Sequence, residues 1–346
     1  MEKRPRKYMT TKNHFFGSLK SKIKQLKKRS HVRNIVKGIP DTENSTFTSD
    51  SRLFVTGGKG IYEIKSTGGK DKPIQLLKGP NCTGIVEHKA YLYATCIDLK
   101  MNPKKLFKTT GFKPLNFFSR KYWLTNLTEI SGERQLLAAK VKGVAKPKFQ
   151  KVKVLKDMFI PNGLGVDQSG NLFSADETFV GGGKIVKIKI SASDPMKVST
   201  PEVWADKGVD SPNGIIVHGP DLYFTDGGTV KKANIMNSGA VGKITQLYSR
   251  KTIFDDLTVV EDKEYGVVLI VTDFIKGSIF SLNPKTNKII KETRAVTFAG
   301  PSSVNQGKPP ISSPAEIVVT EKGFLGETKT KVGNRVSAIA LKHLGL

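Results

Sequence analysis

The segment Pro161-Asn-Gly-Leu-Gly-Val166, which leads into Asn171-Leu-Phe-Ser-Ala-Asp176, contains the pattern that decides the fold. The pattern returns in Pro212-Asn-Gly-Ile-Ile-Val217, which leads into Leu222-Tyr-Phe-Thr-Asp226. Each copy has an apolar strand, a tight polar turn and a second apolar strand, as a β-hairpin does. A hairpin that recurs along the chain indicates a repeat architecture.

Looser copies bring the number of hairpins to six. Their first strands are expected at residues 43–47, 82–86, 162–166, 213–217, 256–260 and 315–319. A glycine and a third strand follow most hairpins, and a fourth apolar run usually precedes the next copy. Four strands in each repeat of roughly 40–50 residues are typical of a propeller blade. The sequence therefore predicts an all-β fold, a six-bladed β-propeller.

The ends of the chain indicate how the ring closes. The last copy lacks an outer strand, and residues 32–39 resemble the outer run that precedes Cys82. We predict that this N-terminal segment is the outer strand of the last blade, which leaves no long open edge. The domains are then a basic tail at 1–31 and the propeller at 32–346. Residues 97–150 are too long for the remaining strands of the second blade, and residues 300–312 extend the turn before the sixth, so a long loop is expected in each stretch.

The charge of the chain is concentrated near its start. The 346 residues carry 57 Lys or Arg and 30 Asp or Glu, a net charge of +27, and residues 1–39 contribute 12 of these charges. Apolar residues at helical spacing among the lysines of 15–29 indicate a short amphipathic helix. Residues 1–30 and the basic, aromatic-rich stretch 97–125 could contact an anionic membrane surface. The alternatives are a solvated tail on a generally basic protein and, less favoured, a nucleic-acid partner.

The chain contains no run of about 18 apolar residues and no apolar core of a signal peptide near its start. We therefore expect no transmembrane segment and no classical signal peptide, and a cytoplasmic or peripheral membrane location. Cys82 and Cys96 are nearly symmetric about a turn, so a cross-strand disulfide is possible. Two unpaired buried thiols are the favoured interpretation because no export signal is present.

Equivalent first-strand positions of a propeller face a common axis, so their side chains can converge. Counting back four residues from an apolar anchor in each blade gives the ring Glu43, Cys82, Asn162, Asn213, Asp256 and Ala315. Two carboxylates and two amide oxygens suit one Ca²⁺ ion, with other divalent ions possible, and suit zinc poorly. The predicted metal ligands are Glu43, Asn162, Asn213 and Asp256. The alternative for each Asn-Gly pair alone is turn chemistry.

Residues 161–173 and 211–217 resemble the repeated motif of a calcium-dependent superfamily of six-bladed propellers. Its members include senescence marker protein/gluconolactonase, diisopropyl fluorophosphatase, paraoxonase and strictosidine synthase. The order Glu, Asn, Asn, Asp on blades one, three, four and five is similar to that of the first three families, which implies a catalytic Ca²⁺. Asp255-Asp256 resembles the fifth-blade motif of paraoxonases, which implies that Asp255 is a further ligand. Asn81 lies where paraoxonases carry a histidine motif, so a histidine base is disfavoured and Asn81 is assigned to substrate binding.

The resulting functional prediction is a calcium-dependent hydrolase of lactones or esters, including aryl esters. The metal would polarise the carbonyl, and Asp256 would act as base or nucleophile, with Asp255 as the alternate base. Asn162 could bind substrate instead of metal. The alternative is a non-enzymatic propeller with structural calcium, attached to a membrane or nucleic acid through its basic tail.

Overall fold

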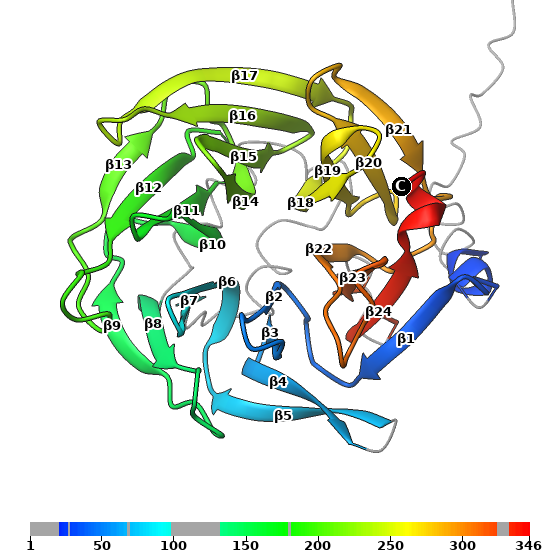
Figure 1. Cartoon of the computed structure of the whole chain (residues 1–346), viewed down its shortest axis with the longest axis horizontal. Helices are drawn as coiled ribbons and strands as arrows, with labels where there is room; N and C mark the ends of the chain where they lie inside the picture. The colour runs from blue at the N-terminus through cyan, green and yellow to red at the C-terminus, as the bar shows by residue number, and fades with distance from the viewer. Residues whose placement is uncertain (1–20, 27, 68–69, 98–131, 179–180, 324–331) are drawn as a thin grey trace, which may run out of the picture.

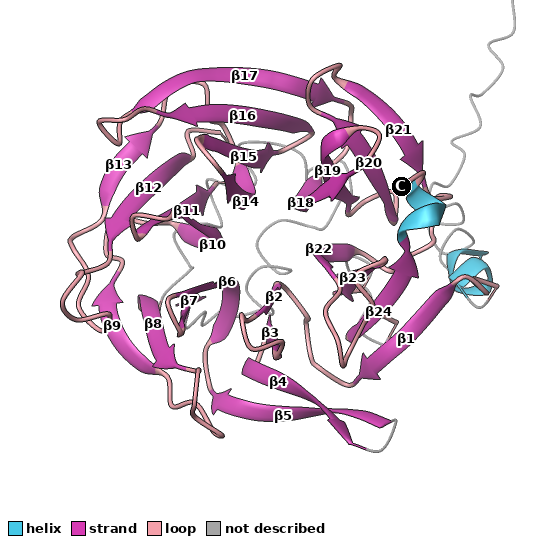
Figure 2. Ribbon diagram, viewed as in Figure 1, coloured by secondary structure: helices cyan, strands magenta, loops and turns pink. Residues whose placement is uncertain are grey.

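The chain folds into six four-stranded antiparallel sheets that are arranged as a ring (Figure 1). This computed structural model describes residues 21–26, 28–67, 70–97, 132–178, 181–323 and 332–346. Strands dominate the described residues, with short helical segments near the two ends of the chain (Figure 2). The predicted all-β, six-bladed propeller is confirmed.

The strands of each blade run in sequence order from the axis of the ring outward, except in blade six. Blade one contains β2 (Ser45–Phe47), β3 (Leu53–Gly57), β4 (Gly60–Thr67) and β5 (Lys70–Lys78). Blade two contains β6 (Asn81–His88), β7 (Tyr91–Ile97), β8 (Arg134–Lys140) and β9 (Gln150–Val154). Blade three contains β10 (Ile160–Val166), β11 (Asn171–Glu177), β12 (Lys184–Lys189) and β13 (Glu202–Ala205).

Blades four to six complete the ring. Blade four contains β14 (Pro212–His218), β15 (Asp221–Asp226), β16 (Thr229–Ile235) and β17 (Val241–Ser249). Blade five contains β18 (Phe254–Asp262), β19 (Gly266–Asp273), β20 (Ser278–Asn283) and β21 (Lys288–Glu292). Blade six contains β22 (Pro301–Gln306), β23 (Glu316–Glu321), β24 (Arg335–Ala340) and β1 (Val32–Lys37). A 3₁₀ helix, η2 (Leu341–Leu344), follows β24, and residues 21–26 are α-helical.

The N-terminal strand closes the ring, as the sequence predicts. Strand β1 pairs antiparallel with β24, from Val32 opposite Ile339 to Lys37 opposite Arg335. Figure 1 shows the two strands side by side at the outer edge of blade six. The last blade is therefore completed by the first strand of the chain, and no strand edge of β24 is left unpaired.

The strand assignment within blade six was wrong. The innermost strand is β22, which lies in the stretch 300–312 that was expected to be a loop. Residues 315–319 belong instead to the second strand, β23, and Ala315 is an exposed residue before it. The reason is that β22 carries Ser302 and Ser303 at the positions where blades three and four have Asn-Gly, so the hairpin pattern of this blade is hidden.

Neighbouring blades pack on each other through apolar side chains. The buried cluster between blades three and four includes Phe173 and Trp204 of blade three, whose rings meet edge to face with centroids 4.9 Å apart, and Ile215 and Phe224 of blade four. The glycines of the Asn-Gly pairs allow the innermost strands to approach. A Cβ atom on Gly163 would lie 2.1 Å from the carbonyl oxygen of Asn213. These glycines are therefore required by packing, because no side chain fits between the two strands.

A buried acid lies at the end of the second strand, or one residue before it, in four blades: Asp176, Asp226, Asp273 and Glu321. Each one pairs with the residue that begins the hairpin, as Asp176 does with Pro161. Each also has a basic partner, namely Lys184 at 3.6 Å, Lys231 at 2.5 Å, Arg250 at 2.6 Å and Arg29 at 2.8 Å, respectively. The acids accept hydrogen bonds near the start of the innermost strand, so they tie the two ends of each hairpin together.

Blade two replaces this acid with a disulfide. Cys82 and Cys96 are directly opposite each other in β6 and β7, with Cα atoms 3.9 Å apart and sulfurs 2.04 Å apart. The favoured interpretation of two unpaired thiols was therefore wrong. It rested on the lack of an export signal, whereas the strand register places the two thiols in contact. Cys82 and Cys96 occupy the same positions in blade two as Pro161 and Asp176 do in blade three. The covalent bond therefore replaces the hydrogen bonds and ion pair that the acid makes in blade three.

Candidate functional site

The strand registers identify which residues share the position nearest the axis. In blades three, four and five a bulge follows Pro161, Pro212 and Phe254, each of which pairs with the acid of the second strand. The next residues are therefore equivalent, and they are Asn162, Asn213 and Asp255. The same comparison gives Thr83 in blade two and Ser302 in blade six.

Blade one joins the same ring through its hydrogen bonds. The amide of Asn44 donates to the hydroxyl of Thr56, as the amide of Gly214 does to Thr225 and that of Asp256 to Thr272. Glu43, which precedes Asn44, is therefore equivalent to Asn213 and Asp255. The structure places three of the four expected ligands at this position, namely Glu43, Asn162 and Asn213, together with Asp255 in place of Asp256.

Asp256 lies one residue beyond the ring. Its carboxylate accepts hydrogen bonds from the Ser303 hydroxyl and from the backbone of Leu257 and Val304, and it packs on Gly214. Burial raises the pKa of Asp256 to about 7, while the Ser303 hydrogen bond acts in the opposite direction. The carboxylate is thus wedged between blades four and six. In the sequence, the ring position of blade five was counted back four residues from Val260. The strand register shows that Val259 is the correct starting point, because Leu257 and not Thr258 is equivalent to Ile215.

Glu177 joins the ring residues although it comes from a second strand. It is the last residue of β11, and it is buried. The Asn162 amide donates to one of its carboxylate oxygens at 2.8 Å, and the Asn213 amide donates to the other at 3.4 Å. Burial raises the pKa of Glu177 to about 7; the Asn162 hydrogen bond lowers it, and the negative charge of Glu43 raises it further.

Lys322 brings a positive charge to the same place. It follows β23, and its ammonium group donates a hydrogen bond to the Glu43 carboxylate. Burial alone would lower the pKa of Lys322, but the charge of Glu43 and then that of Asp255 raise it above its ordinary value. About a third of the Lys322 side chain remains exposed, 34%. The raised pKa keeps the ammonium charged while it is paired with Glu43.

Asp255 completes the group. Burial raises the pKa of Asp255 well above its ordinary value, and the neighbouring charges of Glu43 and Glu177 raise it further, whereas Lys322 lowers it. We call the following six residues the axial cluster: Glu43, Asn162, Glu177, Asn213, Asp255 and Lys322. Sequence reasoning missed Glu177 and Lys322 because neither belongs to a first strand. A usable signal was present, since each directly follows the buried acid of its second strand, Asp176 or Glu321.

The donor chemistry of the axial cluster fits a hard divalent cation. Its three carboxylates and two amide oxygens come from four blades, and one ammonium group balances only part of their charge. The side chains are not already arranged around a metal position, however. Over the described residues, no group of three or more His, Cys, Asp or Glu side chains is placed to hold a metal ion. The carboxylates of Glu43 and Glu177 are held instead by Lys322 and by the two asparagine amides.

The remaining predicted residues lie elsewhere. Asn81 begins β6 opposite Ile97 and is half-buried, and Cys82 offers no ligand because it is bonded to Cys96. Most of the stretch 97–125, and residues 1–20 of the basic tail, lie outside the described residues. In the part of the chain that the structure describes, no helix has the length and apolar character needed to span a bilayer.

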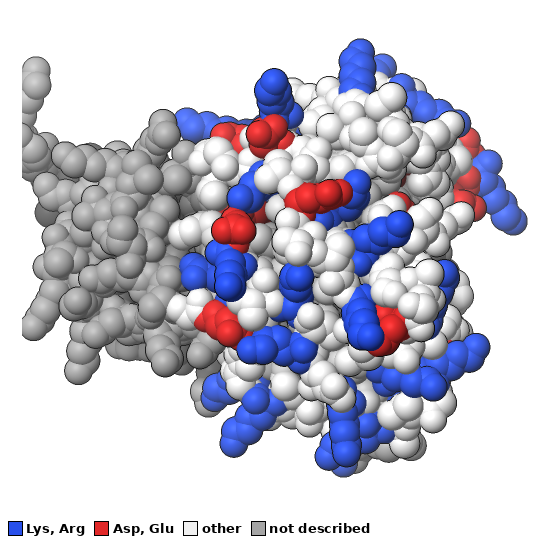
Figure 3. Space-filling view, turned by 90° about the vertical axis from the view of Figure 1, so that its left-hand side faces the viewer, with Lys and Arg blue, Asp and Glu red and all other residues white. Residues whose placement is uncertain are grey.

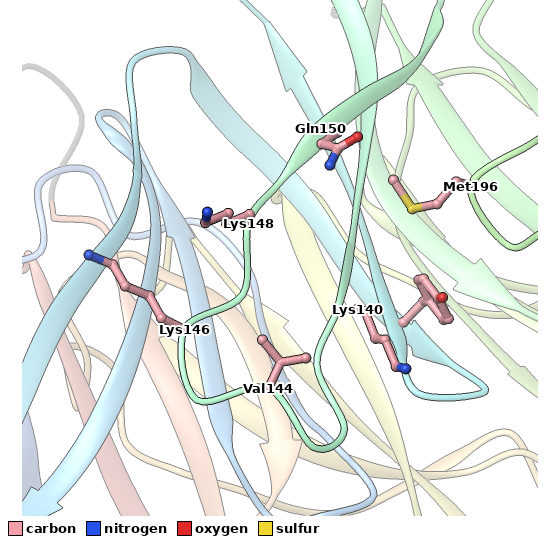
Figure 4. Close-up of a pocket in the computed structure, with 7 residues that line it drawn as sticks. Lys140, Val144, Lys146, Lys148, Gln150 and Met196 are labelled. Carbon is pink, nitrogen blue, oxygen red and sulfur yellow. The ribbon is translucent and has the colours of Figure 1, made fainter.

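A separate hollow lies mainly on blade two. It has a volume of about 340 Å³ and is formed mainly by the β8–β9 connection (Figure 4). Its lining residues are Tyr91, Lys140, Val144, Lys146, Lys148, Gln150 and Met196. Basic side chains are also scattered over the side of the ring in Figure 3 rather than gathered in one patch. The hollow shares no lining residue with the axial cluster.

Comparisons with known proteins support the fold. No model of a known protein family matches the sequence, and no curated protein matches it. Among solved structures, a luciferin-regenerating enzyme is 14% identical with a TM-score of 0.62, over 89% of this chain and 94% of that one. A gluconolactonase of Xanthomonas campestris is 11% identical with a TM-score of 0.56, over 89% of each chain.

The same fold is also found in a nidogen/laminin complex, at 17% identity and a TM-score of 0.52, over 78% of this chain and 84% of that one. At these identities the likeness concerns the fold alone. The predicted resemblance to gluconolactonase-type six-bladed propellers is confirmed at that level.

Proposed function

We propose that the chain is a hydrolase of lactones or esters whose reaction takes place at the axial cluster. The observation that carries the proposal is Glu177, a buried carboxyl group with a pKa raised to about 7 between the amides of Asn162 and Asn213. A carboxyl group with a pKa near neutrality is suited to general acid–base catalysis. The fold shared with a gluconolactonase supports a lactone as the substrate class.

Calcium is the proposed cofactor. Glu43, Asn162, Asn213 and Asp255 would hold it, with Glu177 beside them, because they offer the hard oxygen ligands that Ca²⁺ prefers. When bound, the ion would supply Lewis-acid polarisation of the substrate carbonyl. Asp255 replaces Asp256 in this set, since the Asp256 carboxylate is already engaged with Ser303, Leu257 and Val304.

The chain's own groups have distinct roles in this proposal. Glu177 takes the proton from the attacking water, because roughly half of a group with this pKa is ionised at neutral pH. Asp255 is the second candidate base. The ammonium of Lys322 lies close enough to influence Glu177 and Asp255, so it can stabilise negative charge that develops on the substrate. Asn162 and Asn213 orient the Glu177 carboxyl through their amides.

The direct test is a panel of lactones and aryl esters, assayed with purified protein with added calcium and after chelation. We expect turnover that falls about 10²–10⁴-fold in Glu177→Gln, which keeps the shape of the side chain and removes the base. Glu292→Gln is the matched control, because Glu292 pairs with Arg250 and Lys276 at the periphery. Equal turnover in Glu177→Gln and wild type would contradict the role of Glu177, and no turnover on the whole panel would contradict the hydrolase.

A second candidate function is a non-enzymatic interaction platform. It is favoured by the nidogen/laminin structure, which has the same fold. A folded protein without turnover on any lactone or ester would favour this alternative.

The proposed partner is an anionic membrane. Residues 1–30 and 97–125 would contact it, and the net charge of +27 would attract the protein to it.

A further inference from the structure

Lys322 and Glu177 occupy equivalent positions in opposite blades. Glu321 pairs with Pro301 in blade six as Asp176 pairs with Pro161 in blade three, so the residues that follow the two acids correspond. Figure 1 shows β22 and β10 on opposite sides of the ring. The lysine and the glutamate therefore approach the axis from opposite directions, and the charge of Lys322 acts on Glu177.

The surroundings of Lys322 are acidic on several sides. Its ammonium donates a hydrogen bond to Glu43 of blade one, and it interacts electrostatically with Asp255 of blade five and with Asp41. Buried carboxylates that lose such a partner are left uncompensated at a considerable cost. Lys322 thus has two properties. Its ammonium is hydrogen-bonded to Glu43, a proposed metal ligand, and it neutralises part of the carboxylate charge that a metal ion would neutralise.

We propose that Lys322 is a built-in counter-cation of the axial cluster, which competes with a divalent ion for Glu43 and its neighbours. The inference rests on the proposed metal site of the cluster. A cation can use the Glu43 carboxylate fully only after the Lys322–Glu43 ion pair has opened. The metal-free protein is accordingly stable, because the ammonium already balances part of the carboxylate charge, and the affinity for divalent cations is moderated.

The test measures cation affinity rather than turnover. Ca²⁺ binding is followed by titration calorimetry, and Tb³⁺ serves as a luminescent probe of the same oxygen ligands. Lys322→Met removes the charge and keeps much of the chain length. We expect it to bind Ca²⁺ at least about tenfold more tightly than wild type, because two like charges at such short range repel strongly. Lys322→Arg retains the charge and is expected to bind as wild type does.

Thermal unfolding provides an independent readout. Metal-free Lys322→Met is expected to melt at a lower temperature than wild type, and calcium is expected to raise its midpoint by more than it raises that of wild type. Lys276→Met is the matched control, since Lys276 pairs with Glu292 at 2.8 Å outside the cluster. This control should change neither the cation affinity nor the response to calcium. If Lys322→Met folds only with calcium present, that dependence itself supports the proposal.

An affinity for Ca²⁺ and Tb³⁺ that is unchanged or weaker in Lys322→Met would overturn the counter-cation role, as would the absence of cation binding by either protein. The proposed hydrolase is judged separately by the turnover of wild type on the lactone and ester panel. Turnover with equal affinities leaves the hydrolase standing and removes the role of Lys322. Tighter cation binding in Lys322→Met without turnover in wild type would support the role of Lys322 and contradict the hydrolase.

Discussion

Asp255 and Asp256 are adjacent in the chain and have opposite surroundings. Asp255 has the position of Asn162 and Asn213, and its neighbours are the like charges of Glu43 and Glu177. Asp256 points between blades, where it accepts hydrogen bonds from Ser303 and two backbone amides. The sequence shows two acids in a row, and a strand alternates its side chains between faces. Only the bulge in β18 decides which of the two faces the axis.

Substitution of the two acids should therefore have opposite effects on stability. Asp256→Ala leaves the Ser303 hydroxyl and the backbone amides of Leu257 and Val304 without their acceptor, which should lower the free energy of unfolding by about 1–3 kcal/mol. Asp255→Asn loses the attraction to Lys322, but burial and the repulsion from Glu43 and Glu177 outweigh that attraction, since the pKa of Asp255 is raised well above its ordinary value. The free energy of unfolding of Asp255→Asn should therefore be equal to or above that of wild type. Urea unfolding of both variants checks this. A stable Asp256→Ala beside a destabilised Asp255→Asn would reverse the assignment.

The pKa of Glu177 predicts how stability depends on pH. The folded protein keeps the proton up to about pH 7, whereas the unfolded chain releases it near the ordinary value of 4.5. The folded state thus binds more protons between these values, so stability is lost as the pH rises through this window. The loss from Glu177 alone is roughly 3 kcal/mol. The free energy of unfolding should fall between pH 5 and pH 7.5 in wild type. In Glu177→Gln the fall should be smaller, by about the contribution of Glu177.

The activity should change with pH in the opposite direction. If Glu177 is the base, kcat/KM should rise as the pH increases through the pKa of Glu177, because the carboxylate form is the active one. This pKa is about 7 without a metal ion, and Ca²⁺ bound beside Glu177 should move the rise to lower pH. The same rise should be absent from the residual activity of Glu177→Gln. A rising limb that persists in this variant would assign the base to another group, with Asp255 the first candidate.

Among the structural elements, the second strand of each hairpin has a role that its sequence only partly reveals. Asp176, Asp226 and Asp273 lie at or next to the ends of three of these strands. Each connects its strand to the start of the hairpin through hydrogen bonds, and each forms an ion pair. Blade two has the Cys82–Cys96 disulfide at this register. The disulfide therefore takes the place of the acid that connects the two strands of the hairpin in blades three to six, and its loss should affect blade two first.

Removing the disulfide should destabilise the whole ring. A bridge that closes a loop of about 15 residues contributes roughly 3 kcal/mol by constraining the unfolded chain, and the sequence separation here is 14. The double variant Cys82→Ala/Cys96→Ala should therefore unfold at a lower urea concentration than wild type. Reductant should have little effect on the double variant and should shift wild type towards it, provided that unfolding exposes the bond. Equal midpoints for wild type and the double variant would show that the covalent tie is dispensable.

The repeat was predictable from sequence where its signal was strong. The Asn-Gly pairs and the acids of blades three and four mark their hairpins, and the same count led to the closing strand at 32–39. Blade six was misassigned because Ser302 and Ser303 replace the Asn-Gly pair, and β23 has the stronger apolar pattern. Glu177 and Lys322 were missed because neither belongs to a first strand. The acid that precedes each one marks its register, but their convergence on the axis depends on how the blades are arranged around the ring.

At the scale of the whole molecule, the ring depends on joining its two ends. Strand β1 contributes Ile35 and Val36, which are buried, and Ile39 beyond it is fully buried. Arg29, ahead of β1, forms an ion pair with Glu321 at 2.8 Å and donates to the carbonyl oxygen of Thr297. The N-terminal segment therefore makes both apolar and charged contacts with blade six.

Deletion of residues 1–39 should remove the closing strand and prevent a stable monomer. Burial of three large aliphatic side chains contributes roughly 5 kcal/mol or more, which is comparable to the whole stability of many domains. The deletion also leaves the edge of β24 unpaired, and such edges promote association between chains. Size-exclusion chromatography should show aggregates or an expanded chain. A compact monomer with cooperative unfolding would contradict the importance of this closure.

The positive charge of the molecule gives the last prediction. Residues 1–20 can be removed without touching Arg29 or β1, and they contain six Lys or Arg and one acid. A basic residue near an anionic surface contributes about 1 kcal/mol of attraction, which salt screens. The deletion of 1–20 should therefore bind more weakly than the full chain to vesicles containing phosphatidylserine, in a salt-dependent way. Neutral vesicles are the control, and lactone turnover should be unchanged, because the axial cluster is formed by residues from 43 onward. Equal vesicle binding by both chains would assign the attraction to the lysines of the ring itself, and loss of turnover would show that the tail also supports the site.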